Sequence, residues 1–260
     1  MKTVLLTFDL EEFDLPREFN QEISEDEMYN VSEKGLRAVK KLLEKHSLKV
    51  TFFTTATFAK KYPLIVKELA KEHEIACHSY CHSDNCIEDI SQANLAKKEI
   101  EKIIGKKING FRAPRFEIRD IHRLSEFGFE YDSSTHPTIA PGKYFNIHQK
   151  RKLHKIGNIT EIPLSTLPLI PFLRAPINWY MLRHFPSLYY KLFTGINFAF
   201  SDYLMLILHP WEFTEINHHN IPKEFKKNSG DYVTEKLERY IQFCKKKDYK
   251  FETVSGFLGL

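Results

Sequence analysis

The stretch TVLLTFDLEEFD, residues 3–14, joins a short apolar run to a cluster of carboxylates. Its first half is typical of a buried strand, which we expect at about residues 4–9. Asp9, Glu11, Glu12 and Asp14 then place four carboxylates within the seven positions 8–14. Carboxylates this close raise one another's pKa unless a positive group lies among them. The stretch therefore suggests a bound cation, a neighbouring arginine or a proton-transfer role, although an acidic loop in water has the same composition.

Short β-rich runs alternate with amphipathic stretches of helical length along the rest of the chain. This alternation is typical of a parallel sheet or barrel covered by helices, so we predict an α/β fold. Strands are expected at about residues 4–9, 49–55, 74–79, 107–114, 129–134, 161–165, 203–209 and 249–254. Helices are expected at about 32–46 with Ser32 as N-cap, from Pro63, from Ser91 to near Gly105, at 117–127 and at 230–247. No linker rich in Gly, Ser or Pro appears, so we expect one domain over residues 1–260.

Composition and charge narrow the class of protein. The 260 residues are 42% hydrophobic and 28% charged, as in soluble globular chains, and the net charge is only +4. Basic residues are spread too thinly to predict a nucleic-acid partner. The opening MKTVLLTFDL has no small-residue cleavage site, so we expect no signal peptide and a cytoplasmic location. No apolar stretch approaches the roughly 20 residues that span a bilayer.

The four cysteines allow two interpretations. Three of them lie close to histidines, with Cys77, Cys81 and Cys86 beside His73, His78 and His82. A structural zinc knuckle is one interpretation, but such sites usually pair two separated sets of ligands, and here there is one cluster. Cys244 is far from the others in the sequence. We therefore favour reduced thiols that act as small buried hydrophobic groups.

Several polar residues fall where predicted strands end. Asp9, His78, Arg112, Asp132 and His209 each lie at the C-terminal end of an expected strand or just after it. In parallel α/β barrels, side chains from separate strands converge at that end to form the active site. We expect these five residues to lie close together.

The pentapeptide HSYCH, residues 78–82, carries a candidate metal site. Its histidines are four residues apart, a spacing that places two imidazoles on one face of a helical turn. Two imidazoles and one carboxylate, from Glu11 or Asp9, would form a three-ligand site with an open position, which is the pattern of catalytic metal sites. Two unconnected polar histidines in a loop are the alternative.

Four motifs together resemble a known family. TFDLEEFD, HSYCH, FRAPRF and LILHPWE occur, between residues 7 and 212, in the order and approximate spacing of the NodB-like polysaccharide deacetylases of the carbohydrate esterase family 4 type. The resemblance implies a distorted (β/α) barrel and a metal-dependent hydrolase that removes an acetyl group, expected to be N-acetyl, from a carbohydrate. The chain is most similar to the branch with an FDxE opening and an HPWE close, which is associated with bacterial surface-polysaccharide assembly.

The resemblance also implies a set of metal ligands. Many relatives open with Asp-Asp-Gly, whose second Asp binds the metal, but Leu10 stands at that place here. We assign the third ligand to Glu11, ahead of Glu12 and Asp14. The implied ligands are Glu11, His78 and His82, with zinc as the expected ion and cobalt, nickel or manganese as alternatives.

The catalytic roles follow from the same matches. Asp9 corresponds to the general base, Arg112 to the residue that orients it, and His209 to the general acid. The Asp-x-x-Asp-Trp segment that tunes this acid in the family is not evident, so we take Asp132 as its substitute. The expected substrate contacts are Trp211, whose ring offers a face to a sugar, with Tyr80, Phe116 and Asp132.

Residues 167–193 mix apolar, aromatic and basic side chains, a pattern found at membrane interfaces. One interpretation is docking on the inner face of the membrane to reach a lipid-linked sugar, and the other is a lid or barrel-covering helix, which Pro186 would interrupt. Three further functions stay open: hydrolysis of a small non-sugar amide, an inactive sugar-binding module, and a zinc-stabilised scaffold. The sequence indicates no particular oligomeric state.

Overall fold

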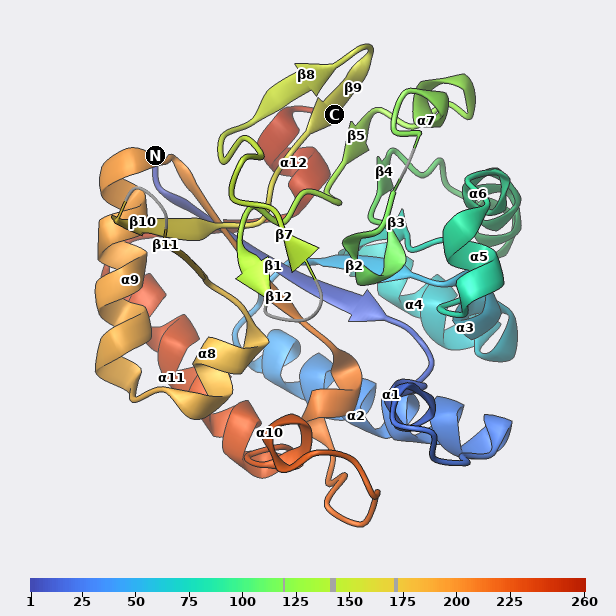
Figure 1. Cartoon of the computed structure of the whole chain (residues 1–260), viewed down its shortest axis with the longest axis horizontal. Helices are drawn as coiled ribbons and strands as arrows, with labels where there is room; N and C mark the ends of the chain where they lie inside the picture. The colour runs from blue at the N-terminus through green and yellow to red at the C-terminus, as the bar shows by residue number, and fades with distance from the viewer. Residues whose placement is uncertain (119, 141–143, 171–172) are drawn as a thin grey trace.

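The computed structural model describes residues 1–118, 120–140, 144–170 and 173–260, and it confirms the predicted α/β fold of distorted barrel type (Figure 1). The main sheet has the strand order β12-β1-β2-β3-β4-β5-β9-β8, and β13 pairs with β1 beside this path. Its pairs are parallel except for the β8–β9 hairpin. The strands are β1 (Thr3–Leu10), β2 (Thr51–Thr54), β3 (Glu74–Cys77), β4 (Gly110–Phe111), β5 (Tyr131–Asp132), β8 (His154–Ile156), β9 (Ile159–Glu161), β12 (Tyr203–Leu208) and β13 (Lys250–Glu252).

Most helices cover one face of this sheet, and two small hairpins stand apart from it (Figure 1). The hairpins are β6 (Ile139–Ala140) with β7 (Tyr144–Phe145), and β10 (Thr166–Ile170) with β11 (Leu173–Pro176). The longer helices are α2 (Glu25–Lys45), α4 (Pro63–Glu72), α6 (Ser91–Ile104), α9 (Ser187–Phe200) and α11 (Asp231–Lys246). The shorter ones are α1 (Leu15–Glu18), α3 (Ala56–Lys61), α5 (Asp84–Glu88), η1 (Pro114–Phe116), α7 (Arg123–Glu126), α8 (Trp179–His184), η2 (Pro210–Phe213), α10 (Lys223–Lys226) and α12 (Val254–Leu258).

Strand β1 lies at the centre of the fold and carries the period-2 pattern of a sheet with two different faces. Its even-numbered residues, Val4 to Leu10, join the large core beneath the helices. On the opposite face, which we call the inner face, Leu5 belongs to a smaller cluster with Phe53, Ala76 and Met205. Residues that continue this odd-numbered row from Leu5 therefore point to the inner side of the sheet.

Local signals set most helix ends, but one predicted start is wrong. The helix expected at 32–46 begins seven residues earlier, at Glu25, because Ser24 caps it by accepting a hydrogen bond from the Glu27 N–H at 3.2 Å. Ser32 lies buried inside the helix instead. As predicted, Gly105 ends α6 in the left-handed conformation.

The predicted segments in the middle of the chain are less regular than expected. Of the helix predicted at 117–127, the structure shows only α7, and residue 119 lies outside the described part. The strand predicted at 161–165 is instead the connection between β9 and β10. Pro186 separates α8 from α9, as expected from its missing N–H. Within the described ranges, no helix combines the length and apolar character required to cross a bilayer.

Candidate metal and catalytic site

Strand alternation carries chemical groups from four strands to one end of the inner face. The row that begins at Leu5 on β1 continues through Thr7 to Asp9 and is followed by Glu11, while β3 is followed by His78. Arg112 follows β4, and His209 follows β12. Because these strands are parallel, their C-terminal ends lie side by side, and the four predicted residues Asp9, His78, Arg112 and His209 come together there.

Glu11, His78 and His82 place three metal-binding atoms within 4.8 Å of one another. Glu11 Oε2 lies 3.1 Å from His78 Nε2 and 3.5 Å from His82 Nε2. All three residues are buried. Two imidazole nitrogens and one carboxylate oxygen are a donor set that suits zinc and its neighbours, so these residues fit a divalent ion.

The other ring nitrogen of each histidine is held by an acceptor. His78 Nδ1 donates to the backbone oxygen of Arg112 at 2.8 Å, and His82 Nδ1 donates to the carboxylate of Asp14 at 3.0 Å. Such contacts fix the tautomer that leaves Nε2 free for a metal. Asp14, a runner-up for the third ligand, thus contacts a ligand instead.

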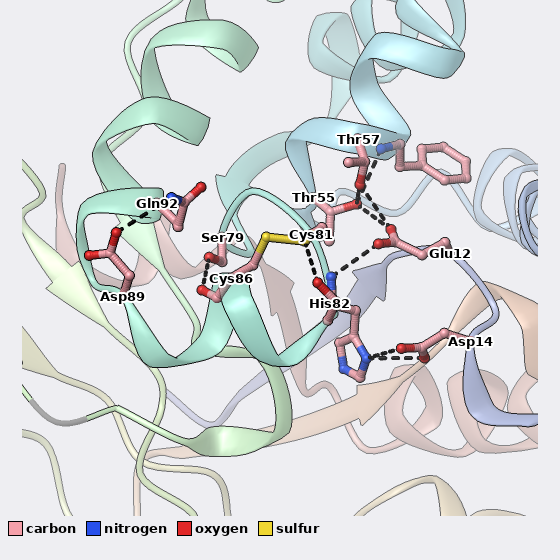
Figure 2. Close-up of a disulfide and its surroundings, with 12 residues drawn as sticks. Glu12, Asp14, Thr55, Thr57, Ser79, Cys81, His82, Cys86, Asp89 and Gln92 are labelled. Carbon is pink, nitrogen blue, oxygen red and sulfur yellow. Dashed lines mark hydrogen bonds and ion pairs between the residues drawn. A yellow bond between two sulfur atoms is a disulfide. The ribbon is translucent and has the colours of Figure 1, made fainter. Parts of the chain in front are cut away.

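A loop, not a helical turn, brings the two imidazoles together. Residues 78–82 are irregular, and Ser79 adopts a left-handed backbone with φ 62°. Figure 2 shows how Glu12, the other runner-up, holds this loop. Its Oε1 accepts from the His82 N–H at 3.0 Å, while its Oε2 accepts from the hydroxyls of Thr55 and Thr57.

A disulfide also constrains this loop, which corrects the prediction that all four cysteines are reduced. Cys81 and Cys86 form a bond with a Cα–Cα distance of 5.6 Å, and His82 lies within the ring that it closes (Figure 2). Cys77 and Cys244 are free and buried, as predicted. Among the described residues, no group of side chains that could hold a metal ion contains a cysteine, so the structure gives no support to the zinc-knuckle scaffold.

Asp9 lies between a fixed cation and the metal donors. Its Oδ1 accepts from Arg112 Nη1 at 2.6 Å, while its Oδ2 lies 3.8 Å from His78 Nε2. The guanidinium of Arg112 is fully buried and also donates to Thr7 and Ser133. A buried network of charge-assisted hydrogen bonds of this kind holds a carboxylate in one orientation.

His209 faces the same centre from β12. Its Nε2 lies 3.9 Å from Glu11 Oε1, and its ring stacks on Trp211 with centroids 5.0 Å apart. Its Nδ1 donates to Glu212 Oε1 at 2.9 Å, and its backbone N–H donates to the same oxygen at 2.7 Å. The second oxygen of Glu212 faces the buried guanidinium of Arg183 at 3.8 Å.

Glu212 is the residue that sequence reasoning missed. His209 and Glu212, three residues apart, form a capping box at the start of η2, and that spacing was readable in the HPWE motif. Asp132, the predicted partner of the acid, is fully buried elsewhere. Its carboxylate accepts from the Ser134 hydroxyl and contacts Glu161, and burial raises the pKa of both acids. The structure thus pairs Asp132 with Ser134 and Glu161, and it is Glu212 that contacts His209.

Charges within the cluster shift the pKa values of its members. Burial opposes ionisation of Glu11, but the neighbouring imidazoles, His82 first, outweigh it and hold the pKa of Glu11 well below its ordinary value. Burial likewise favours neutral His82, yet Glu11 and Asp14 raise its pKa to about 10. Without an ion, His82 therefore keeps its proton at neutral pH, and a metal must displace that proton.

The remaining predicted substrate contacts differ in exposure. Trp211 is 5% exposed and packs against Phe13 as well as His209, with its indole N–H directed at Glu11 Oε1 at 3.5 Å. It therefore supports the site more than it offers a free face to a sugar. Tyr80 and Phe116 are half-buried, and the Tyr80 hydroxyl accepts from Lys60 at 3.0 Å.

Solved structures share this fold at low sequence identity. PuuE allantoinase matches with a TM-score of 0.65 and 15% identity, over 98% of this chain and 88% of that one. A putative polysaccharide deacetylase from Mycobacterium smegmatis matches with a TM-score of 0.59 and 16% identity, over 97% and 93%. A CE4 family pseudoenzyme from Bacillus anthracis matches with a TM-score of 0.53 and 15% identity, over 98% and 64%. At these identities the likeness concerns the fold alone.

The chain spans about two thirds of the length of the Bacillus anthracis pseudoenzyme, 64% to 66% in its three structures. Among curated proteins, no sequence matches this chain. The family profile described as polysaccharide deacetylase, however, matches residues 1–131, half of the chain, and this half contains Asp9, the three metal donors and Arg112. The chain therefore belongs to the polysaccharide deacetylase family.

Proposed function

We propose that the chain is a metal-dependent hydrolase that removes an N-acetyl group from a carbohydrate. One observation carries this proposal: Glu11, His78 and His82 converge beside an aspartate paired with arginine and a histidine paired with glutamate. Amide hydrolysis needs a group that accepts a proton from water and another that gives one to the leaving nitrogen. The site offers one candidate for each.

Asp9 is the proposed general base and His209 the proposed general acid. The guanidinium of Arg112 holds the Asp9 carboxylate in place through a hydrogen bond of 2.6 Å, so that Asp9 is positioned to accept a proton from the attacking water. A divalent ion held by Glu11, His78 and His82 would polarise the acetyl carbonyl and lower the pKa of that water. His209 then protonates the leaving nitrogen, and its hydrogen bond to Glu212 favours the protonated ring that this step requires.

The protonation of His209 is supported by its surroundings. Burial alone lowers the pKa of a histidine, but the hydrogen bond to Glu212 and the charges of Glu11 and Asp9 raise the pKa of His209 above its ordinary value. A raised pKa keeps more of the His209 ring protonated at a given pH than in a free imidazole, which suits the proposed acid.

The first experiment measures metal and acetate on the same samples. Wild type, Asp9→Asn and a His78→Ala/His82→Ala variant are analysed for metal content and for acetate release from acetylated glucosamine oligomers. We expect the double histidine variant to lose about one equivalent of metal per chain and to lose acetate release as well. Asp9→Asn keeps its metal and loses activity by roughly 10²-fold or more. His154→Ala, on β8, serves as the control.

Two other outcomes would change the assignment. If wild type holds no zinc, cobalt, nickel or manganese after reconstitution and releases no acetate, the hydrolase proposal fails and an inactive sugar-binding module takes its place. If wild type cleaves small amides such as allantoin but no acetylated sugar, the substrate class is a non-sugar amide. An O-acetylated sugar in the same panel tests the choice of N-acetyl.

We also propose that residues 1–260 form one catalytic unit. The N-terminal strand β1 pairs with β12 along one edge and with β13 and then β2 along the other. A chain whose two ends share a central strand supports a single domain. A role in surface-polysaccharide biosynthesis stays a prediction from the FDxE and HPWE motifs.

The predicted membrane contact is supported by an apolar row on α9. One face of this helix packs through Tyr190 and Phe198 into the core, while Leu188 and Leu192 on another face are 75% and 55% exposed. The helix thus covers the barrel and also offers apolar surface for a lipid interface. Residues 171–172 of the predicted segment lie outside the described residues.

Co-sedimentation with anionic vesicles tests this contact. We expect wild type to bind and Leu188→Glu/Leu192→Glu to bind at least tenfold more weakly, while Leu64→Glu, at an 80% exposed leucine on α4, binds like wild type. Equal binding of all three, or no binding, would contradict it. The cytoplasmic location stays a prediction, and the Cys81–Cys86 disulfide favours an oxidising compartment instead.

A further inference from the structure

We propose that Glu27, His218 and His219 form a second binding site for a borderline divalent ion such as zinc or nickel. The three residues offer one carboxylate oxygen and two imidazole nitrogens within 4.8 Å of one another. Glu27 lies in the first turn of α2, and the two histidines lie in the loop between η2 and α10. None of them belongs to the catalytic cluster described above.

The distances between these atoms suit coordination. Glu27 Oε1 lies 3.6 Å from His218 Nε2 and 3.7 Å from His219 Nε2, and the two imidazole centroids are 4.1 Å apart. Tetrahedral zinc with bonds of about 2.0–2.1 Å separates neighbouring ligand atoms by about 3.3–3.4 Å. Shifts of a few tenths of an ångström therefore bring both nitrogens and the shared oxygen to ligand positions.

The ring of His219 is the second observation that points to a ligand. The side chain is 8% exposed, and among the described residues its Nε2 has no hydrogen-bond partner. Phe13 packs edge-on against the ring at 5.0 Å, and the His219 backbone oxygen accepts from Lys226. A fixed, buried imidazole nitrogen without a hydrogen bond is costly, and an ion on the Glu27 side would satisfy it.

Glu27 supplies the anionic ligand from a fixed backbone. Its N–H donates to the Ser24 hydroxyl at the helix cap, so its position is set by the start of α2. Glu27 also lines an open cavity of about 530 Å³ together with Arg17, Gln21 and Ser24. The Glu27 and His218 side chains are 45% and 64% exposed, so an ion and a water molecule can reach them from solvent.

The site would join two segments that support the catalytic cluster. Phe13 contacts His219 on one side and Trp211 on the other, with ring centroids 5.0 and 5.3 Å apart. An ion at Glu27 would therefore fasten the 214–222 loop to α2 behind the ring that faces Glu11. We assign it a stabilising role, because Asp9 and His209, the proposed base and acid, belong to the other cluster.

The experiment isolates this site from the catalytic one. Zinc is titrated calorimetrically into the His78→Ala/His82→Ala protein, with nickel as a second probe. We expect about one ion to bind per chain, and at least a tenfold loss of affinity when Glu27→Gln/His218→Ala is added. Zinc should raise the melting temperature of the His78→Ala/His82→Ala protein. It should not raise that of the protein that also carries Glu27→Gln/His218→Ala. His154→Ala in the same background is the matched control.

Wild type provides an independent measurement if the quadruple variant does not fold. Its metal content should be about two ions per chain and fall to about one in His218→Ala, while acetate release stays unchanged. The proposal is overturned if the His78→Ala/His82→Ala protein binds no zinc or nickel, or binds them equally well with and without Glu27 and His218. Neither result depends on whether the chain is a deacetylase.

Discussion

His209 and Asp9 have opposite requirements at neutral pH, because the proposed acid must hold a proton and the proposed base must lack one. A buried counter-charge serves each of them: Glu212 contacts His209 at 2.9 Å, and Arg112 contacts Asp9 at 2.6 Å. The two pairs come from different strands and meet near Glu11. The pKa of His209 thus depends on Glu212, a side chain that contacts the proposed acid from behind.

Replacing Glu212 with Gln tests this arrangement. Glutamine keeps the shape but removes the charge that raises the pKa of His209, so the ring should lose its proton at lower pH. An acid is active only while protonated, so the alkaline limb of the kcat profile should move to lower pH. Glu215→Gln, at a carboxylate that contacts Asn217, is the control. An unmoved alkaline limb in Glu212→Gln would exclude a tuning role.

The loop of residues 78–83, which leads into α5, has no regular secondary structure, so separate contacts must hold the candidate metal donors. Glu12 binds its backbone, Asp14 binds the His82 ring, and a disulfide closes it. A ring of six residues removes about 2 kcal/mol of chain entropy from the unfolded state in the simplest treatment. The loop that carries His78 and His82 is therefore partly ordered before any ion binds.

Removal of the disulfide should therefore weaken metal binding. We expect Cys81→Ser/Cys86→Ser to bind zinc about tenfold more weakly than wild type in competition with a chromophoric chelator, because His82 becomes less well positioned. Reducing agent should produce the same loss in wild type and no further loss in the variant. Equal affinities in all samples would mean that Glu12 and Asp14 suffice to position His82.

The contact of α2 with η2 positions the HPWE segment and depends on a glycine. A Cβ at Gly35 would lie 1.8 Å from the backbone oxygen of Pro210, so the helix approaches this segment only because no side chain intervenes. The neighbouring residues His209, Trp211 and Glu212 all serve the site. The helix thus supports the acid from outside the sheet.

We expect Gly35→Ala to destabilise the fold by about 1–3 kcal/mol, as overpacking does, and to lower kcat through a displaced His209. Gly195→Ala is the matched control. It lies exposed in α9 with no heavy atom within 4 Å of its Cβ, so it should raise stability by about 0.5–1 kcal/mol through helix propensity. Urea denaturation measures both, and a neutral Gly35→Ala would refute the close contact.

At the scale of the whole molecule, buried His136 makes folding sensitive to acid. Burial, followed by the charge of Arg112, lowers the pKa of His136 to about 3. The unfolded chain takes up this proton below about pH 6.5, whereas the folded chain does not until about pH 3. The free energy of unfolding should therefore be fully present above pH 6.5 and fall by up to about 1.4 kcal/mol per pH unit between these values.

Urea denaturation of the metal-free protein at pH 7, 5 and 4 measures this slope. We expect His136→Asn to be less stable at pH 7 but to lose less stability on acidification than wild type. His154→Asn on β8 should keep the wild-type slope. Identical slopes for wild type and His136→Asn would show that His136 contributes nothing to acid unfolding.

Sequence patterns predicted the sheet better than the connections. The strands near residues 4–9 and 203–209 and the helices starting at Pro63 and Ser91 are present, because their apolar period and end signals are local. The α2 start was wrong because Ser24 and Ser32 are both plausible caps, and only packing decides between them. The strands expected at 107–114 and 129–134 are only two residues long each, as β4 and β5.

The sequence by itself determined the family, the α/β class and the set of residues Asp9, Glu11, His78, Arg112 and His209. The family follows from the order of the motifs, and the positions of these residues follow from the local period of each strand. Only the tertiary structure decided their partners. The pairing of Asp14 with His82, of Arg183 with Glu212 and of Glu27 with His218 and His219 joins segments that lie far apart in the chain. Such contacts require distances correct to a few tenths of an ångström, and the packing of helices against the sheet sets those distances.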